Sequence, residues 1–269
     1  MIYREFAKTN FKVSVVGMGT YYDASWIALA MLLKIKRKKK SKIQALRAGL
    51  DNGINFIDSA EIYQSEDLVK EAILGRKRDE LFIATKVWSN HLRYDEVEKS
   101  CKRSLSKLGT SYVDLYQIHF PNSKVPMKET MRAMEALVDR GLVRNIGISN
   151  FSYFEMLEAE SALEKYELAS TQMHYNIKHR DVEKEILPHC DKEKIAMIPY
   201  YPLAHGALAR GASFKENVTP GQAALAWLIA RSKMNFPIPR ASRADHVRED
   251  AAAGDIVLTE EEMIKLDGI

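Results

Sequence analysis

The chain has 269 residues, of which 46% are hydrophobic, and it carries a formal charge of +4. This composition supports a sizeable core, and a small positive excess suits an anionic small ligand as well as nucleic acid. The two cysteines, Cys101 and Cys190, form neither a disulfide framework nor a metal-type spacing. The chain also begins without the apolar stretch of a secretion signal, so we expect a reducing, cytoplasmic compartment.

Apolar runs that are typical of strands alternate with helical patterns along the whole sequence. The predicted strands are Ser14–Gly17, Ile54–Asp58, Leu81–Lys86, Val113–His119, Val143–Ser149, Ala169–His174, Ala196–Tyr200 and Phe236–Pro239. The predicted helices are Lys42–Asn52, Ser65–Leu74, Asp95–Leu108, Met127–Arg140, Tyr153–Tyr166, Asp181–Cys190 and Pro220–Arg231. Eight such β-then-α units predict an α/β fold, a (β/α)8 TIM barrel that forms a single domain over residues 1–269.

Two further elements flank the predicted barrel. Ile2–Phe6 and Phe11–Val13 are expected to pair as a β-hairpin beneath it, and Thr259–Leu266 reads as an extra C-terminal helix. An open, doubly wound sheet would fit the same alternation. However, Gly17 and Gly19 are followed by no third glycine, so the dinucleotide-binding fingerprint of that fold is absent.

An apolar segment, Ala24–Leu33, is followed by the basic cluster Lys34–Lys40. The apolar part is much shorter than the ~20 residues that a membrane span needs. We therefore expect no membrane span but a buried or interfacial helix and a solvated basic turn. A weak anion or nucleic-acid patch is the alternative, and we expect no nucleic-acid partner.

Four residues of different chemistry lie at or just beyond predicted strand ends: Asp58, Tyr63, Lys86 and His119. In a parallel barrel these ends share one mouth. A nearby ammonium lowers the pKa of a tyrosine, and a carboxylate holds the ammonium charged, which predicts an Asp58–Lys86–Tyr63 relay with the tyrosine as proton donor. His119 can hydrogen-bond a carbonyl oxygen and position it.

Each of these residues also has a structural explanation when it is taken alone. Asp58 could cap a helix, Lys86 could be exposed, Tyr63 could pack in a loop, and His119 could be a buried core histidine. The four together at the ends of barrel strands favour a functional site.

Eight motifs in this order and spacing resemble the aldo-keto reductase family over nearly the whole chain. They are Val16–Thr20, Asn52–Tyr63, Ala84–Trp88, Asp114–His119, Asn145–Phe151, Gln172–Asn176, Tyr200–Leu203 and Ile238–Ala241. The resemblance implies reduction of aldehydes or ketones by NADPH or NADH without a metal. It makes Tyr63 the acid, Asp58 and Lys86 its activators, and His119 the residue that orients the carbonyl.

The resemblance also implies how a cofactor is held. Ser149, Asn150 and Gln172 would bind the carboxamide, Tyr200 would stack on the nicotinamide, and Pro202 and Leu203 would border the pyrophosphate. The adenosine end would lie along Arg240–Asp250. The full set of expected cofactor positions is Gly19, Thr20, Asp58, Ser149, Asn150, Gln172, Tyr200, Pro202, Leu203, Arg240, Ala241, Ser242, Arg243, His246 and Asp250.

The adenosine segment departs from the family pattern at four positions. The family usually has lysine at Arg240, serine at Ala241 and asparagine at Asp250, and often arginine at His246. Guanidinium groups still suit a 2′-phosphate, so NADP(H) is expected to be preferred and NAD(H) stays open.

Family positions that line the substrate pocket carry Tyr21, Trp88, His119 and Phe120 here. They predict an apolar pocket for small carbonyl compounds. We expect a monomer or small homo-oligomer, a state that these residues do not decide. A regulatory subunit of the same fold, which binds cofactor with vestigial turnover, is the alternative.

Overall fold

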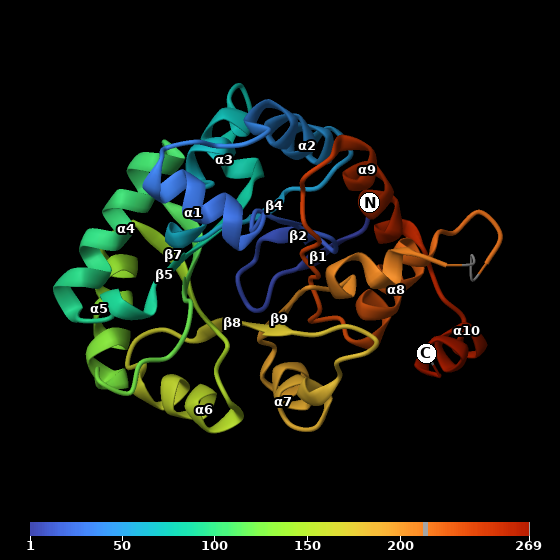
Figure 1. Ribbon diagram of the computed structural model, residues 1–269. Coiled ribbons are helices and arrows are strands. Elements are labelled where there is room, and N and C mark those ends of the chain that lie inside the picture. Colours follow the sequence, from blue (N-terminus) through green and yellow to red (C-terminus); the bar gives the residue numbers. More distant parts are fainter. Residues whose placement is uncertain (212–214, 269) are drawn as a thin grey trace.

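The computed structural model describes residues 1–211 and 215–268. Its centre is a parallel seven-stranded sheet in which neighbouring strands follow chain order, so that the wall curves around a single axis (Figure 1). The strands are β3 (Met18–Gly19), β4 (Phe56–Asp58), β5 (Phe82–Val87), β6 (Val113–Ile118), β7 (Val143–Ser149), β8 (Leu168–His174) and β9 (Ala196–Tyr200). The chain therefore has the predicted (β/α)8 barrel fold.

An irregular segment, residues 235–240, closes the barrel between its first and last strands. On one side Phe236 and Ile238 donate backbone hydrogen bonds to β9; on the other, the carbonyls of Pro237 and Pro239 accept from the β3 side. The predicted strand Phe236–Pro239 is thus wrong as a regular strand, because each proline lacks the N–H that a ladder needs. The predicted first strand, Ser14–Gly17, was also misplaced: Ser14 pairs with Tyr3 in the hairpin, and the barrel strand begins at Met18.

The predicted hairpin is confirmed and closes the lower end of the barrel. It consists of β1 (Tyr3–Glu5) and β2 (Lys12–Ser14), which pair antiparallel. The Phe6 ring after β1 lies 4.5–5.9 Å from the rings of Phe56, Phe82 and Phe236. These rings belong to a fully buried cluster inside the barrel that is distinct from the larger core between strands and helices.

Helices cover the outside of the barrel (Figure 1). They are α1 (Ala24–Leu32), α2 (Lys39–Asp51), α3 (Glu66–Ile73), α4 (Tyr94–Leu108), α5 (Met127–Asp139), α6 (Tyr153–Ala162), α7 (Ile186–Glu193), α8 (Pro220–Arg231), α9 (Ala244–Ala252) and α10 (Glu260–Asp267). The helix expected in the apolar segment after Tyr22 is α1, and α10 is the expected C-terminal helix. Helix α9 is not among the predicted helices, because the family resemblance assigns its residues to the adenosine segment and implies no helix there.

Short 3-10 turns complete the connections, at Glu61–Tyr63, Arg78–Glu80, Ser89–His91, Asp181–Glu183, Ala204–Ala209 and Ala253–Asp255. Within the described ranges, every helix is too short or too polar to cross a bilayer.

Candidate functional site

The four predicted residues meet at the carboxyl ends of adjacent strands. Asp58 is the last residue of β4, Lys86 lies near the end of β5, and His119 follows β6 directly. Tyr63 ends the 3-10 turn Glu61–Tyr63, where Gln64 takes a positive φ of 56° and terminates the turn. All four side chains are at most 9% exposed.

Lys86 and Asp58 form a buried ion pair. The Lys86 Nζ donates to Asp58 Oδ2 at 2.6 Å and to the Ser59 carbonyl at 2.8 Å. The other carboxylate oxygen of Asp58 accepts from Gln172 at 3.0 Å and from Gln117 at 3.3 Å. A buried pair of charges needs such additional hydrogen bonds to offset its loss of solvent, and they hold both groups in fixed positions.

Tyr63 and His119 form the second half of the cluster. The Tyr63 hydroxyl lies 3.3 Å from His119 Nε2, and Lys86 Nζ lies 5.0 Å from the centre of the Tyr63 ring. In the part of the chain that the structure describes, no hydrogen bond joins Lys86 to Tyr63. In the predicted relay, Asp58 and Lys86 are therefore in direct contact, whereas Lys86 and Tyr63 are close to each other without a hydrogen bond.

Electrostatics in this cluster keeps Tyr63 protonated. Burial raises the pKa of Tyr63 well above its usual value, and the charge of Asp58 adds to that increase. The expected lowering of this pKa is thus wrong for the free protein, because burial of the hydroxyl dominates and the charge of Asp58 acts in the same direction. Burial lowers the pKa of Lys86, which Asp58 counteracts.

His119 is neutral over the ordinary pH range. Burial, assisted by the charge of Lys86, lowers the pKa of its imidazole to about 2. Its Nδ1 atom is buried and has no hydrogen-bond partner among the described residues. A neutral imidazole can present an Nε2–H group to an oxygen atom beside the Tyr63 hydroxyl.

A hydrogen-bond chain connects this cluster to the residues expected at the carboxamide. The Tyr200 hydroxyl donates to Asn150 Oδ1 at 2.8 Å, and Asn150 Nδ2 donates to Ser149 Oγ at 3.0 Å and to the His119 carbonyl at 2.9 Å. Ser149 Oγ in turn donates to the carbonyl of Gln172, whose side chain reaches Asp58. The Tyr200 ring stacks on His174 at 5.5 Å.

The remaining positions of the expected cofactor site lie along β3 and the adjoining loops. Thr20 Oγ1 donates to the Asp58 carbonyl at 2.9 Å, and Gly19 is hydrogen-bonded through its backbone to the segment 235–240. Pro202 is buried and Leu203 is half-buried in the turn after β9. These residues surround the same end of the barrel.

The expected adenosine segment lies against helix α2 and the basic turn before it. Arg240 Nη1 donates to the Tyr22 carbonyl at 2.6 Å, and Ser242 accepts a hydrogen bond from Ser41 through its carbonyl at 3.5 Å. Arg243 is exposed and pairs with Asp245. Ala241 is buried and His246 is exposed, the latter on α9.

Asp250, the last expected cofactor residue, is buried on α9. Burial raises the pKa of its carboxyl to about 8, and the charge of Glu249 contributes. Asp250 is therefore neutral at pH 7 and resembles the asparagine of the family pattern in charge.

Aromatic rings border the four-residue cluster. The Tyr21 ring lies 5.2 Å from Tyr63, and Trp88 lies 5.3 Å from His119. Phe120 is 40% exposed and stacks on His119 at 5.1 Å. The structure thus brings the expected pocket residues together around Tyr63 and His119.

Two buried side chains in this region were not predicted. Gln117 contacts Asp58, and it lies two residues before His119 on β6, where strand periodicity points it to the same face. Glu61 accepts hydrogen bonds from the Trp88 backbone at 2.7 Å and from His91 at 2.8 Å. Only Gln117 had a usable sequence signal, since the partners of Glu61 come from a separate turn.

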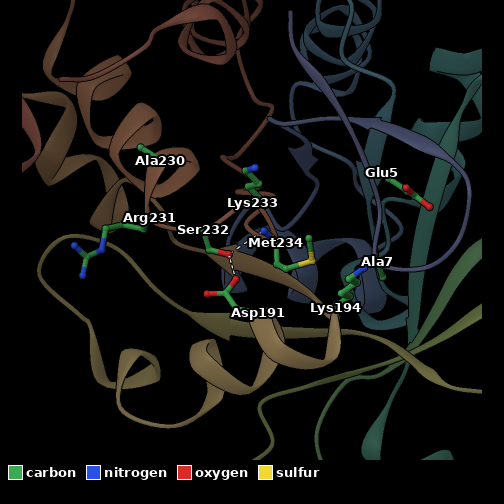
Figure 2. Close-up of a pocket in the computed structure, with 9 residues that line it drawn as sticks. All are labelled: Glu5, Ala7, Asp191, Lys194, Ala230, Arg231, Ser232, Lys233 and Met234. Carbon is green, nitrogen blue, oxygen red and sulfur yellow. Dashed lines mark hydrogen bonds between the residues drawn. The ribbon is translucent and has the colours of Figure 1, made fainter. Parts of the chain in front are cut away.

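A cavity of about 520 Å³ lies at the opposite end of the barrel (Figure 2). Its lining includes Glu5 of the hairpin, Lys194 before β9 and Ser232 after α8, and Asp191 accepts a hydrogen bond from Ser232. Lys194 precedes β9 and Ser232 precedes the closing segment, so the cavity lies at the end of the barrel away from the four-residue cluster.

A (β/α)8 barrel with an acid, a lysine, a tyrosine and a histidine at its mouth defines the class of this protein. The model of the Aldo/keto reductase family matches residues 30–218 and 212–269. The chain belongs to the aldo/keto reductase family.

Individual members of the family are similar to this chain over nearly their full lengths. Methylglyoxal reductase YeaE of Escherichia coli (strain K12) is 32% identical and is covered over 91% of its length by 96% of this chain. The thermostable aldo-keto reductase Tm1743, solved with the inhibitor epalrestat, is 34% identical, with a TM-score of 0.87 over 100% of this chain and 99% of its own. An aldo-keto reductase from Klebsiella pneumoniae, solved with NADPH, is 31% identical, with a TM-score of 0.86 over 100% and 95% of the two chains.

Proposed function

We propose that this protein reduces aldehydes and ketones to alcohols, with NADPH as its preferred cofactor and Tyr63 as the proton donor. The observation that carries this proposal is the contact between the Tyr63 hydroxyl and His119 Nε2 at 3.3 Å, beside the buried Lys86–Asp58 pair. One carbonyl oxygen placed between the hydroxyl and the imidazole can bond to both groups.

Proton delivery follows from the protonation states of these side chains. Tyr63 holds its proton because burial raises its pKa, and the alkoxide formed from a carbonyl is a far stronger base than a phenolate. The proton therefore moves from the Tyr63 hydroxyl to the former carbonyl oxygen. The Lys86 ammonium, 5.0 Å from the ring centre, stabilises the phenolate that remains.

Positioning of the carbonyl is the proposed role of His119. A neutral imidazole donates from Nε2 without competing for the proton of Tyr63, and its lowered pKa keeps it neutral. Tyr21, Trp88 and Phe120 supply an apolar border that excludes water from the reacting group.

The residues at the mouth fit a nicotinamide cofactor, which supplies a hydride to the carbonyl carbon when it is bound. Asn150, Ser149 and Gln172 offer amide and hydroxyl groups to the carboxamide from one connected network. Tyr200 is joined to this network and is expected to stack on the nicotinamide ring.

Preference for NADPH is proposed from the charges at the adenosine end. Arg240 and Arg243 lie at this end, and Lys42 lies near Arg240. Burial lowers the pKa of Lys42, Asp23 raises it, and the charge of Arg240 lowers it further. Such a group of cations suits the 2′-phosphate that distinguishes NADPH from NADH. The neutral state of Asp250 removes a charge that would oppose this phosphate.

Small aldehydes and α-dicarbonyls are the proposed substrates. A relative of similar length is named a methylglyoxal reductase, and the aromatic border here is apolar and partly open at Phe120. We further propose that residues 1–269 act as one domain, as a monomer or small homo-oligomer, in a reducing cytoplasmic compartment that keeps the buried Cys101 and Cys190 free.

Replacement of Tyr63 by phenylalanine tests the proposed acid. Tyr63→Phe should lower kcat for NADPH-dependent reduction of methylglyoxal by a factor of about 10²–10⁴, because general acid catalysis contributes that much. The dissociation constant for NADPH, measured by quenching of protein fluorescence, should change little. Turnover near the wild-type rate in this variant would refute the assignment.

The same assay separates an enzyme from a regulatory subunit. Repeated NADPH oxidation by the wild-type protein with a panel of aldehydes supports the reductase. Stoichiometric NADPH binding without turnover for any member of the panel would favour the regulatory alternative.

A further inference from the structure

An exposed apolar surface with a basic border lies on the segment Met31–Lys40, which we call the α1 ridge. The apolar residues are 49% (Met31), 81% (Leu32), 62% (Leu33) and 50% (Ile35) exposed. Bulky apolar side chains exposed in one continuous run are unusual on a protein that faces only water, and such patches mark interaction sites.

The α1 ridge is held firmly to the barrel. Asp23 caps helix α1, the Trp26 side chain is buried against Tyr22 at 5.1 Å, and its indole Nε1–H donates to the Arg37 carbonyl at 3.1 Å. Lys36 and Lys39 pair with Asp67 and Glu71 of α3. The apolar residues are thus exposed although the segment that carries them is packed against the barrel.

Four further cations of the α1 ridge are exposed: Lys34, Arg37, Lys38 and Lys40. Within residues 1–211 and 215–268, none of the four has an ion-pair partner. Apolar side chains beside unpaired cations complement an anionic lipid surface, where the cations meet headgroups and the apolar groups enter the interface. A second copy of this chain would bring the same cations together, which disfavours self-association through this face.

The ridge lies close in sequence to the mouth of the barrel. Only Tyr22 and Asp23 separate Tyr21, which contacts Tyr63, from helix α1, and α1 is drawn near the viewer in Figure 1. Helix α1 has nine residues, too few to span a bilayer. Contact at the surface is the only mode that its length allows.

We propose that the α1 ridge docks this protein onto anionic lipid bilayers, with Met31, Leu32, Leu33 and Ile35 in the interface and Lys34, Arg37, Lys38 and Lys40 on the headgroups. This docking does not depend on the proposed reaction. It predicts binding that requires acidic lipid and weakens as salt screens the charges.

Vesicle sedimentation tests the proposal with the full chain. The wild-type protein should pellet with vesicles of phosphatidylcholine and phosphatidylserine, and not with phosphatidylcholine alone. Lys34→Gln, Arg37→Gln and Lys40→Gln together should weaken this binding by about 100-fold, since each basic residue near such a surface contributes about fivefold. Leu32→Ser with Leu33→Ser should weaken vesicle binding by about tenfold or more.

Matched variants elsewhere on the molecule provide the controls. Lys12→Gln, Lys178→Gln and Lys233→Gln remove the same charge from other exposed positions, and Phe154→Ser with Leu157→Ser removes an exposed apolar pair from α6. Both controls should bind like the wild type. All variants should have the circular dichroism spectrum and the urea-unfolding midpoint of the wild type, which shows that they are folded without relying on the proposed reaction.

Several results would overturn the proposal. These are failure of the wild type to bind phosphatidylserine vesicles, equal binding to both vesicle types, or equal losses in ridge and control variants. Self-association would also overturn it. In that case the wild type would associate in analytical ultracentrifugation as its concentration rises, and would not bind vesicles. Leu32→Ser with Leu33→Ser would abolish this association, which would assign the face to a second copy.

Discussion

Individual side chains at the barrel mouth are fixed by hydrogen bonds that no single strand could provide. Lys86 is fully buried, its charge is balanced by Asp58, and its ammonium also donates a hydrogen bond to the carbonyl of Ser59. Residue type and strand position predict that Asp58, Tyr63, Lys86 and His119 share one mouth, and the structure brings the four side chains together there. The direction of the Tyr63 pKa was not predictable, because it depends on burial and on how completely Asp58 pairs with Lys86.

His119 makes the stability of the protein dependent on acid. The pKa of its imidazole is about 2 in the folded protein and about 6.5 in an unfolded chain. Between these values the unfolded state binds more protons, so the free energy of unfolding falls as the pH falls. When the pH is lowered from 7 to 5, the free energy of unfolding should fall by about 2 kcal/mol more in the wild type than in His119→Gln.

Urea unfolding of both proteins at the two pH values measures this difference. The comparison cancels the titration of carboxylates that both proteins share. Equal losses in the two proteins would show that His119 is protonated normally in the folded state.

At the scale of elements, helices were predicted well where their ends carry local signals. Helix α8 begins at Pro220 after the capping residue Thr219, and α4 is capped by Gly109 with a φ of 65°. The predicted end of α6 at Tyr166 was wrong. Glu135 of α5 accepts backbone hydrogen bonds from Glu164, Lys165 and Tyr166, which draws this stretch out of the helix that ends at Ala162.

Helix α9 carries a buried acid whose titration opposes that of His119. The pKa of Asp250 is about 8 when folded, against its ordinary value of 3.8. Between these values the folded state binds the extra proton, so stability falls as the pH rises. As the pH rises through this range, the free energy of unfolding of the wild type should fall by up to about 1.4 kcal/mol per pH unit because of Asp250. Asp250→Asn should remove this contribution.

Thermal or urea unfolding between pH 5 and pH 8 tests this expectation. The wild type should lose stability relative to Asp250→Asn as the pH increases. Glu249→Gln serves as the control, because it removes the neighbouring charge and should reduce the wild-type slope only slightly. Parallel stability curves for the wild type and Asp250→Asn would contradict a raised pKa.

For the whole molecule, closure of the barrel depends on close approach of two backbones at β3. A Cβ atom on Gly19 would lie 2.9 Å from the Ile238 carbonyl oxygen, a backbone atom of the closing segment. Gly19→Ala would therefore push this seam apart. We expect a loss of about 1–3 kcal/mol in the free energy of unfolding, as for other overpacked sites.

Gly221→Ala is the matched control for this substitution. Its new Cβ would meet Ala209 at 3.4 Å, an ordinary contact, and alanine favours the helix in which it lies. This variant should be as stable as the wild type or slightly more stable. Equal stabilities for the two variants in urea unfolding would show that the seam tolerates a larger separation.

The sequence by itself determined the barrel, the order of its strands and the four residues at its mouth. Each of these follows from local periodicity or from a side chain at a strand end, and such signals can be read from the order of the residues alone. The tertiary structure decided the barrel seam, the neutral states of Tyr63, His119 and Asp250, and the exposure of the α1 ridge. These depend on burial and on partners distant in the chain, such as Pro239 beside Gly19, and no local pattern encodes which groups lose their contact with water.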